Sequence, residues 1–413
     1  MSSTSPATLV SGGTLVPPVI LFFCLFFSSS VTAAEPDICV TQANGDEVCG
    51  KLESWTTEKL TITVHEKRSV PLTDIADVRF PLAKRRHQTS DWVVLGTGDR
   101  FPVSVVKVAD DTLTAAWSRS PRRPELAFPL ENVAAIIRQL PPAPAIRREW
   151  LGALTRLPPG NDVVRLVVGD DLSGEFTAWD NGLVQWQGSL GAMQLDLQRL
   201  RWIRFDPELT AKNKLPATWW TVMLVDGTRF TATECRPRPD LTIEWTLPIG
   251  GSLVLPRHEI EKLTRWSPQR QVLSQREPIE TKLTPYLAGT RAIVIDRSVA
   301  QSPLSLRGEE FAAGVSMPSR AEVTYRVESG DSVFRATVGI DDASEGTGSA
   351  RFTVRVDDRV VWESEELTGR SPKVVLPSIK LDGAKTLTLF VDYGEFGDVG
   401  DLANWCDASI WQK

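Results

Sequence analysis

Histidine is scarce in this sequence, and its three copies stand far apart, at His65, His87 and His258. The chain also has no Cys-x-x-Cys pair and no cluster of His and Cys, so it lacks the ligand spacing of a zinc site. The string from His258 to Lys262 starts like the zinc helix of a metalloprotease, but Lys262 stands where the second histidine must be. The sequence therefore offers no basis for a zinc enzyme.

An excess of basic side chains is also missing. The formal net charge is -6, and its distribution is uneven: residues 35–289 carry 32 acidic and 32 basic side chains, whereas residues 290–413 carry 20 and 14. Binding to nucleic acid needs a basic face, so nucleic acid is excluded as the expected partner. The acidic excess of the C-terminal third leaves room for a cation site.

Only one long apolar run is present, from Leu15 to Phe27. It is too short to span a bilayer as a helix, and Pro17-Pro18 would break it. Small residues that suit signal cleavage follow at Ala33 and Ala34. We therefore predict a signal peptide over residues 1–34 and a protein that is secreted, or held in the periplasm or cell envelope, with no transmembrane span after cleavage. A retained membrane anchor is the alternative.

Four cysteines remain after such cleavage: Cys39, Cys49, Cys235 and Cys406. Cys39 and Cys49 flank Asn44-Gly45, a strong signal for a tight hairpin turn. Such a hairpin would bring the two side chains together across adjacent strands, and an exported chain permits disulfides. We predict a Cys39–Cys49 disulfide, with two separate thiols as the alternative, and expect Cys235 and Cys406 to be separate thiols.

A pattern of short alternating strands repeats four times in the first two thirds of the chain. Each unit opens with a strand and a Gly/Asp turn and ends in an apolar strand followed by proline, and these ends are 60 to 66 residues apart. The period of two indicates strands with one buried face. The pattern predicts β-barrel repeats at residues 35–82, 90–142, 160–208 and 217–269.

The order of elements in each unit is strand, turn, long bent strand, strand, short helical turn and last strand. This order resembles an SH3-like or Sm-like barrel at the level of the fold alone, and barrels of this kind host many functions. Proline-rich joints at residues 140–144 and 157–160 predict short, stiff spacers. Four tryptophans in or beside strands of the fourth unit are expected to be core or cross-strand pairs, with a sugar-stacking platform as the alternative: Trp219, Trp220, Trp245 and Trp266. We interpret the repeats as a scaffold or a surface for protein interactions.

The chain changes character at about Leu283. Alternating segments at residues 321–327, 334–340, 350–356 and 385–392 predict strands, and Asp357-Asp358 predicts a hairpin turn. With about 125 residues and some eight strands, this third predicts an antiparallel β-sandwich of the jelly-roll kind over residues 283–413. The predicted fold class is therefore all-β: tandem small barrels followed by a sandwich.

Several landmarks recur in order through this region. They are Asp296-Arg-Ser298, the Gly314-Val315-Ser316 element, Val338-Gly-Ile-Asp341-Asp342, Gly348-Ser349, Leu367-Thr-Gly369 and the ending Asp401-Leu-Ala-Asn404-Trp405-Cys-Asp407. This order resembles the NPCBM family, the carbohydrate-binding module noted beside glycoside hydrolase family 98 catalytic domains and related to carbohydrate-binding module family 51. The resemblance implies a galactose-binding-like sandwich. Three positions depart from the family pattern: Ser316 replaces a frequent histidine, Asn404 an aspartate and Cys406 a small residue.

Sugar recognition needs directional polar partners for the hydroxyl groups and an aromatic face for the ring. The segment of residues 392–401 is rich in glycine and carboxylates, holds two aromatics and contains no Lys or Arg. We predict that Tyr393, Glu395, Phe396 and Asp398 bind the sugar. The alternative is a solvated loop without a ligand.

A structural calcium ion is a further prediction, because the resemblance to galactose-binding-like sandwiches implies one. Calcium prefers six to eight oxygen ligands, mostly carboxylates and carbonyls. The candidate ligands are Asp341, Asp342, Asp398, Asp401 and Asp407. The chain has no EF-hand spacing, and the alternative role for Asp341 and Asp407 is to cap strand ends through backbone hydrogen bonds. Trp405 is expected in the core.

Hydrolysis of a glycosidic bond needs a paired acid and base across a cleft, and the sequence shows no such pair. We therefore predict a secreted, non-catalytic carbohydrate-binding protein. Its C-terminal module would bind a glycan, with a galactose-type glycan as the candidate, while the barrels act as scaffold. The alternative is a structural or protein-interaction component of the envelope, with envelope proteins as partners, whose sandwich has lost sugar binding.

Overall fold

The computed structural model describes residues 36–81, 83, 89–117, 125–211, 213–284, 286, 291–395 and 397–412. Glu35–Lys413 forms one compact unit by itself. The signal peptide predicted for residues 1–34 lies outside the described residues. In the described part of the chain, every helix is too short or too polar to cross a membrane.

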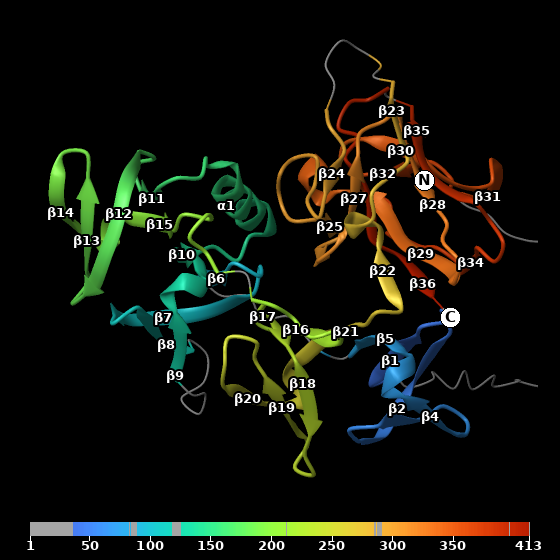
Figure 1. The fold of residues 1–413 in the computed structure, drawn as a ribbon, viewed down its shortest axis with the longest axis horizontal. Helices are drawn as coiled ribbons and strands as arrows, with labels where there is room; N and C mark the ends of the chain where they lie inside the picture. Colours follow the sequence, from blue (N-terminus) through green and yellow to red (C-terminus); the bar gives the residue numbers. More distant parts are fainter. Residues whose placement is uncertain are drawn as a thin grey trace, which may run out of the picture. The chain divides into compact units, whose positions relative to one another are not determined.

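The fold is all-β, as predicted, and the four repeats share one strand topology (Figure 1). In each repeat the last strand pairs with the first, and from the first to the fourth each strand pairs with the next one in the chain. Repeat 1 comprises β1 (Ile38–Gln42), β2 (Glu47–Trp55), β3 (Lys59–Thr63), β4 (Lys67–Pro71) and β5 (Ile75–Arg79). Repeat 2 comprises β6 (Ser90–Leu95), β7 (Arg100–Ala109), β8 (Thr112–Trp117), β9 (Glu125–Pro129) and β10 (Val133–Leu140).

Repeats 3 and 4 follow the same plan, except that one strand of repeat 4 is broken at Thr233. Repeat 3 comprises β11 (Asp162–Leu166), β12 (Asp171–Asp180), β13 (Leu183–Gly188), β14 (Gly191–Asp196) and β15 (Leu200–Arg204). Repeat 4 comprises β16 (Trp219–Leu224), β17 (Arg229–Ala232), β18 (Glu234–Pro237), β19 (Thr242–Thr246), β20 (Ser252–Pro256) and β21 (Ile260–Trp266). A short 3₁₀ turn precedes the last strand of every repeat, at η1 (Leu72–Asp74), η2 (Leu130–Asn132), η3 (Leu197–Arg199) and η4 (Arg257–Glu259).

The first turn of every repeat has the same geometry. A glycine with positive φ donates its N–H to the carbonyl three residues earlier, at 2.9 Å in all four repeats: Gly45, Gly98, Gly169 and Gly227. Their φ values lie between 81° and 105°, a region that residues with a Cβ rarely adopt. The repeated glycine in the sequence is thus explained by the backbone of a single turn type.

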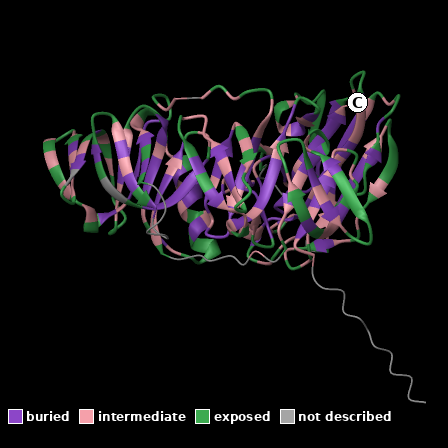
Figure 2. Ribbon diagram, turned by 90° about the horizontal axis from the view of Figure 1, so that it is seen from below, coloured by how far each residue is buried: buried purple, intermediate pink, exposed green. Residues whose placement is uncertain are grey.

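The repeats form one body rather than separate beads. The last strands pair antiparallel across repeats: β5 of repeat 1 with β21 of repeat 4, and β10 of repeat 2 with β15 of repeat 3. Phe101 of repeat 2 also stacks on Phe230 of repeat 4, with ring centroids 6.1 Å apart. Buried apolar residues from all four repeats consequently join in one hydrophobic core, which Figure 2 shows as purple segments along the strands.

A helix that was not predicted lies between the two proline-rich joints. The segment between repeats 2 and 3 forms α1 (Pro144–Arg156), with Pro144 in its first turn, where a missing N–H costs nothing. Leu151 and Leu154 pack against Trp92 and Trp202. The prolines thus flank a helix and start it, and the apolar face of that helix covers the joint between the two repeats.

The tryptophans of repeat 4 are core and cross-strand residues. Trp219 and Trp266 face each other across β16 and β21 and stack with centroids 4.8 Å apart. Trp220 and Trp245 are buried. These positions leave the indoles little surface on which to stack a sugar.

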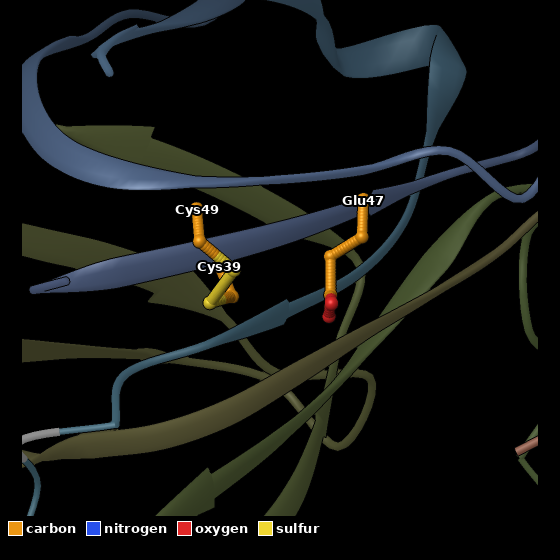
Figure 3. Close-up of side chains that lie close together, drawn as sticks. All are labelled: Cys39, Glu47 and Cys49. Carbon is orange, nitrogen blue, oxygen red and sulfur yellow. A yellow bond between two sulfur atoms is a disulfide. The ribbon is translucent and has the colours of Figure 1, made fainter. Parts of the chain in front are cut away.

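A disulfide joins Cys39 and Cys49, which face each other in register on β1 and β2 (Figure 3). Glu47 lies beside the two sulfurs, and this trio is the one group of three potential metal ligands found among the described residues. Metal binding needs thiolates, so the closed disulfide removes it as a metal site. Cys235 and Cys406 are free thiols, the second fully buried.

The sandwich consists of two antiparallel sheets. The first runs β24 (Val294–Ile295), β27 (Gly314–Met317), β36 (Ala403–Gln412), β29 (Asp331–Ile340), β33 (Val374–Val375), with β22 (Arg270–Val272) beside β36 and β34 (Ile379–Lys380) beside β29. The second runs β23 (Glu280–Leu283), β28 (Ala321–Arg326), β35 (Thr386–Tyr393), β30 (Ser349–Val356), β31 (Arg359–Glu363), with β32 (Leu367–Thr368) beside β30. A small hairpin pairs β25 (Ser305–Leu306) with β26 (Glu309–Glu310), and two 3₁₀ turns lie at η5 (Leu273–Gln275) and η6 (Asp342–Ser344).

Strand pairing into the sandwich begins at Arg270, before the predicted start at Leu283, because β22 pairs with β36. Trp405 is fully buried between the sheets, as expected, with its ring 5.4 Å from Phe352. Asp357 and Asp358 both have positive φ and form the β30–β31 hairpin turn that the sequence predicted.

Partly buried ion pairs tie the barrels to the sandwich. Arg100 of β7 pairs with Glu310 of the small hairpin, and Lys262 of β21 lies 3.1 Å from Glu309. Burial alone would raise the pKa of Glu310, but the Arg100 guanidinium outweighs it and holds that pKa below its usual range. Arg147 and Arg229 add to this field. Glu310 is thus the counter-ion of a small group of buried arginines.

We predict that Glu310→Gln destabilises residues 35–413 by about 3 kcal/mol, because it removes the carboxylate that pairs with the buried Arg100 guanidinium. The measurement is the midpoint of chemical denaturation. The control is Glu365→Gln, an exposed carboxylate of the same sandwich, which should stay within about 0.5 kcal/mol of the wild type. Equal stability of the two variants would contradict the role of Glu310 at this joint.

Candidate functional site

The predicted sugar-binding loop joins β35 to β36 and is held against the start of β30. Gly394 donates its N–H to the carbonyl of Ser349 at 3.0 Å, and the N–H of Glu395 donates to the Glu366 carboxylate at 2.8 Å. A Cβ on Gly348 would lie only 2.2 Å from the carbonyl oxygen of Gly400, so the two loops approach as closely as glycine allows. Gly394, Glu395 and Gly400 are therefore anchored against neighbouring segments.

Two tyrosines meet at this loop. Tyr286 and Tyr393 lie edge to face with ring centroids 5.5 Å apart, and the Tyr393 hydroxyl donates to the carbonyl of Thr284. The Tyr286 side chain is 64% exposed, and its ring borders Gly397. Exposed aromatic surface of this kind, with a polar tip, suits a binding face. Tyr286 was not predicted from the sequence, where its one signal is an aromatic outside any alternating strand.

Charged groups surround the tyrosine pair. Glu395 is exposed and Asp398 is half-buried. Asp392, beside Tyr393, lies 3.5 Å from the Arg320 guanidinium, whose side chain is about half exposed. These groups offer both donors and acceptors for hydroxyl groups. Of the predicted sugar contacts, Tyr393, Glu395 and Asp398 lie together at this end of the sandwich, whereas Phe396 lies outside the described residues.

Asp401 is the last residue of this loop, and its side chain faces the protein interior. It is 1% exposed, and its carboxylate accepts the N–H of Ser349 at 2.7 Å and the hydroxyl of Ser319. Burial raises the pKa of Asp401 to about 6, and nearby Asp398 adds to the rise. With both oxygens bonded inside the protein, Asp401 supports the loop rather than contacting a ligand.

The other predicted calcium ligands lie in different environments. Asp341 is fully buried and accepts the N–H groups of Ala343 and Ser305 at 2.8 and 3.1 Å, which is the capping role given as its alternative. The Asp342 carboxylate accepts two backbone N–H groups of the loop between β25 and β26. Asp407 faces the barrels and lies 3.6 Å from the Lys262 ammonium.

These five carboxylates do not form a single set of ligands. Among the described residues, they contribute to no group of three within coordinating distance. Their oxygens instead accept protein N–H and O–H groups or face cations. They therefore do not fit one calcium site, and we assign calcium no role here. Calcium binding by the protein stays a prediction.

The positions that depart from the family pattern are interior. Ser316 donates its hydroxyl to the Asn404 side-chain oxygen at 2.6 Å, and the Asn404 amide donates to the Asp341 carboxylate. All three side chains are fully buried. The departures at Ser316 and Asn404 thus belong to one hydrogen-bonded network of the core, and they do not remove contacts from the exposed loop.

Comparison with known families confirms the recognition made from the sequence. Residues 272–411 match the model of the NPCBM/NEW2 domain. This match covers the sandwich from the end of β22 to the end of β36, including the loop with the tyrosine pair. The similarity to this family thus covers the C-terminal third of the chain.

Two curated relatives share part of the chain. Alpha-1,3-galactosidase B of Akkermansia muciniphila is 28% identical over 116 residues, which are 27% of this chain and 14% of that protein. A protein named as an endo-alpha-N-acetylgalactosaminidase in Renibacterium salmoninarum is 28% identical over 108 residues, 26% of this chain and 7% of that protein. The chain thus spans only a small part of the length of both relatives.

Solved structures with similarity to this chain include CBM51 modules. The CBM51 of Clostridium perfringens GH95 in complex with methyl-galactose is 23% identical, with a TM-score of 0.31, and covers 34% of this chain and 99% of that chain. The tandem CBM51 modules of Sp3GH98 from Streptococcus pneumoniae are 13% identical, with a TM-score of 0.31, and cover 48% and 72%.

The raised pKa of Asp401 predicts a defined pH dependence. Between pH 4 and 6 the folded state holds this proton and the unfolded state does not, so stability falls as pH rises through that window. The contribution of this proton to the free energy of unfolding, about 2–3 kcal/mol, is lost by pH 7. Asp401→Asn should remove it, since the amide can keep both hydrogen bonds.

The measurement is the difference in unfolding free energy between pH 4.5 and pH 7. The control is Asp358→Asn, an exposed turn residue, which should leave the difference as in the wild type. Asp341 continues to contribute in every variant, because burial raises its pKa to about 6 as well. An Asp401→Asn profile that overlays the wild type would show that the carboxyl is not protonated in the fold.

Proposed function

We propose that this protein is an exported, non-catalytic glycan-binding protein, whose sandwich binds sugar at the loops that carry Tyr286 and Tyr393. The observation that carries the proposal is the NPCBM/NEW2 match over residues 272–411, the same residues that form this face. The exposed Tyr286 ring supplies an apolar surface for a sugar ring, and the nearby carboxylates and Arg320 supply directional partners for its hydroxyl groups.

A galactose-type ligand is the most direct choice. Both curated relatives carry names that refer to galactose or N-acetylgalactosamine. We apply this to the sandwich as a proposal, because the shared residues are a small part of those enzymes.

Binding without chemistry is supported by the state of the carboxylates. Asp401, which has the raised pKa of a potential acid, is bonded to Ser319 and Ser349 and is 1% exposed. A glycosidase needs two carboxyl groups that both reach the scissile bond. Export is supported by the apolar run and small residues before Glu35 and by the Cys39–Cys49 disulfide, which suits an oxidising compartment.

The test is a glycan array probed with residues 35–413, followed by calorimetric titration of the best ligand. We expect galactose-terminated glycans to bind. Tyr286→Ala should weaken binding about tenfold, the size expected for loss of one aromatic contact. The matched control is Leu190→Ala, which removes a 92% exposed apolar side chain from repeat 3 and should leave affinity unchanged.

A parallel array in EDTA tests calcium, and loss of binding there would restore calcium as a ligand of the protein. Failure of the folded protein to bind any glycan would contradict the proposal. It would favour instead an envelope structural or protein-interaction role in which the sandwich keeps only the fold. Binding that is unaffected by Tyr286→Ala would move the site away from the tyrosine pair.

A further inference from the structure

A polar cavity of about 250 Å³ lies where repeats 1 and 4 meet the sandwich. Its wall includes Asp77 and Arg79 of β5, Arg270 of β22, Arg335 of β29 and Trp411 of β36. The cavity exists only because the barrels and the sandwich come together. It shares no residue with the proposed sugar site.

The wall carries one more basic group than acidic groups. The basic groups are Arg79, Lys262, Arg270, Arg335 and Lys373, and the carboxylates are Glu47, Asp77, Glu309 and Asp407. Burial alone would raise the pKa of Asp77, but Arg270 and Lys262 outweigh it and hold that pKa below its usual range. Asp77 is therefore ionised, and the wall as a whole is left with one uncompensated positive charge.

The lysines pair closely with carboxylates, whereas among the described residues none of the three arginines of the wall has a carboxylate within hydrogen-bond distance. The Lys262 ammonium lies 3.1 Å from the Glu309 carboxylate and 3.6 Å from that of Asp407. Lys373 also pairs with Glu309. The uncompensated charge consequently belongs to the guanidinium groups.

Arg270 is the most deeply placed of them, with a side chain that is 2% exposed. Its guanidinium lies between the rings of Trp266 and Trp411, 4.8 and 5.5 Å from their centroids. Its Nη1 is 3.7 Å from Asp77 and its Nη2 is 3.8 Å from Asp407, which is too long for a hydrogen bond. Among the described residues, Nε and Nη1 of Arg270 have no hydrogen-bond acceptor, and neither does Nε of Arg79.

Buried N–H groups need acceptors, and a charged donor left without one is costly. The cavity is roomy enough to hold the missing acceptor, since a single water needs only about 10–15 Å³ of such volume. Water could satisfy the hydrogen bonds but not the extra charge. A carboxylate or sulfate group does both, and its oxygens match the planar fork of a guanidinium.

We propose that this composite cavity binds one small anion through a carboxylate or sulfate group held by Arg79, Arg270 and Arg335. Trp411 forms an apolar wall beside it. The anion comes from one of two sources, a free inorganic ion or an acidic sugar unit, which share this chemistry. The barrel repeats thereby contribute binding residues of their own in addition to supporting the sandwich.

The test is calorimetric titration of residues 35–413 with sodium sulfate, sodium glucuronate and glucose, at constant ionic strength set with chloride. We expect one anion to bind per chain and glucose not to bind. Tighter binding of glucuronate than of sulfate identifies an acidic sugar as the source, and the reverse identifies an inorganic ion. Failure of both anions to bind, or equal binding of glucose, overturns the proposal.

Two variants locate the binding. Arg335→Gln and Arg79→Gln should each weaken the anion about tenfold or more, the loss expected for one charged hydrogen bond. Because Arg335 also donates to the carbonyl of Gln42 at 2.9 Å, near-UV circular dichroism first checks that its fold is kept, and Arg79→Gln provides the second line of evidence. The control is Arg355→Gln, which removes a guanidinium stacked on Phe390 in the same sandwich and should leave affinity unchanged.

The variants also separate this site from the sugar site. Tyr286→Ala should bind the anion as the wild type does, so failure of either proposal leaves the other intact. If Arg335→Gln and Arg79→Gln both keep wild-type affinity, the anion binds elsewhere and the proposal is wrong.

Discussion

The pairing of last strands across repeats is the interaction on which the rest of the molecule depends. A barrel of about 50 residues buries so little apolar surface that it is only marginally stable by itself. Here β5 pairs side by side with β21, and β10 with β15. The sheet of each repeat is therefore extended by the sheet of its partner repeat. One hydrophobic core then serves all four repeats. The edge that the last strand of each isolated barrel would expose is paired by the same contacts.

That arrangement also determines what the sandwich meets. Because repeats 1 and 4 are joined, β21 leads directly through Ser267 to β22, which pairs with the closing strand of the sandwich. Cations from both barrel pairs, Arg100 and Lys262, then reach carboxylates of the β25–β26 hairpin. Such buried ion pairs are costly when misaligned, so they favour a single register of the two parts. The anion-binding cavity we propose is a product of this joint.

Much of the fold was predictable because its determinants are local. The alternating strands, the glycine of each first turn and the Asp357-Asp358 hairpin are decided by neighbouring residues, and all of them appear in the structure. The helix α1 was missed because its flanking prolines indicate spacers, while its apolar face acquires a meaning only against Trp92 and Trp202. Which repeat pairs with which could not be predicted, since it depends on contacts between residues far apart in the chain, about 185 positions for β5 with β21 and about 67 for β10 with β15.

In the candidate site, too, the features set by neighbouring residues were predictable and those set by distant contacts were not. The acidic-aromatic segment was recognised from composition, but a list of nearby carboxylates does not say which way each one faces. Asp401 and Asp341 point inward to backbone N–H groups, Asp407 points to the barrels, and Tyr286 reaches the loop from a distant part of the chain.

The pairing of β5 with β21 has a last consequence, for biosynthesis. Repeat 1 leaves the ribosome first, but the outer edge of its last strand, β5, forms its backbone hydrogen bonds only after β21 of repeat 4 has been synthesised. During that interval the nascent chain exposes an open sheet edge, so a truncated product that stops before Ile260 would be prone to aggregate and would depend on chaperones.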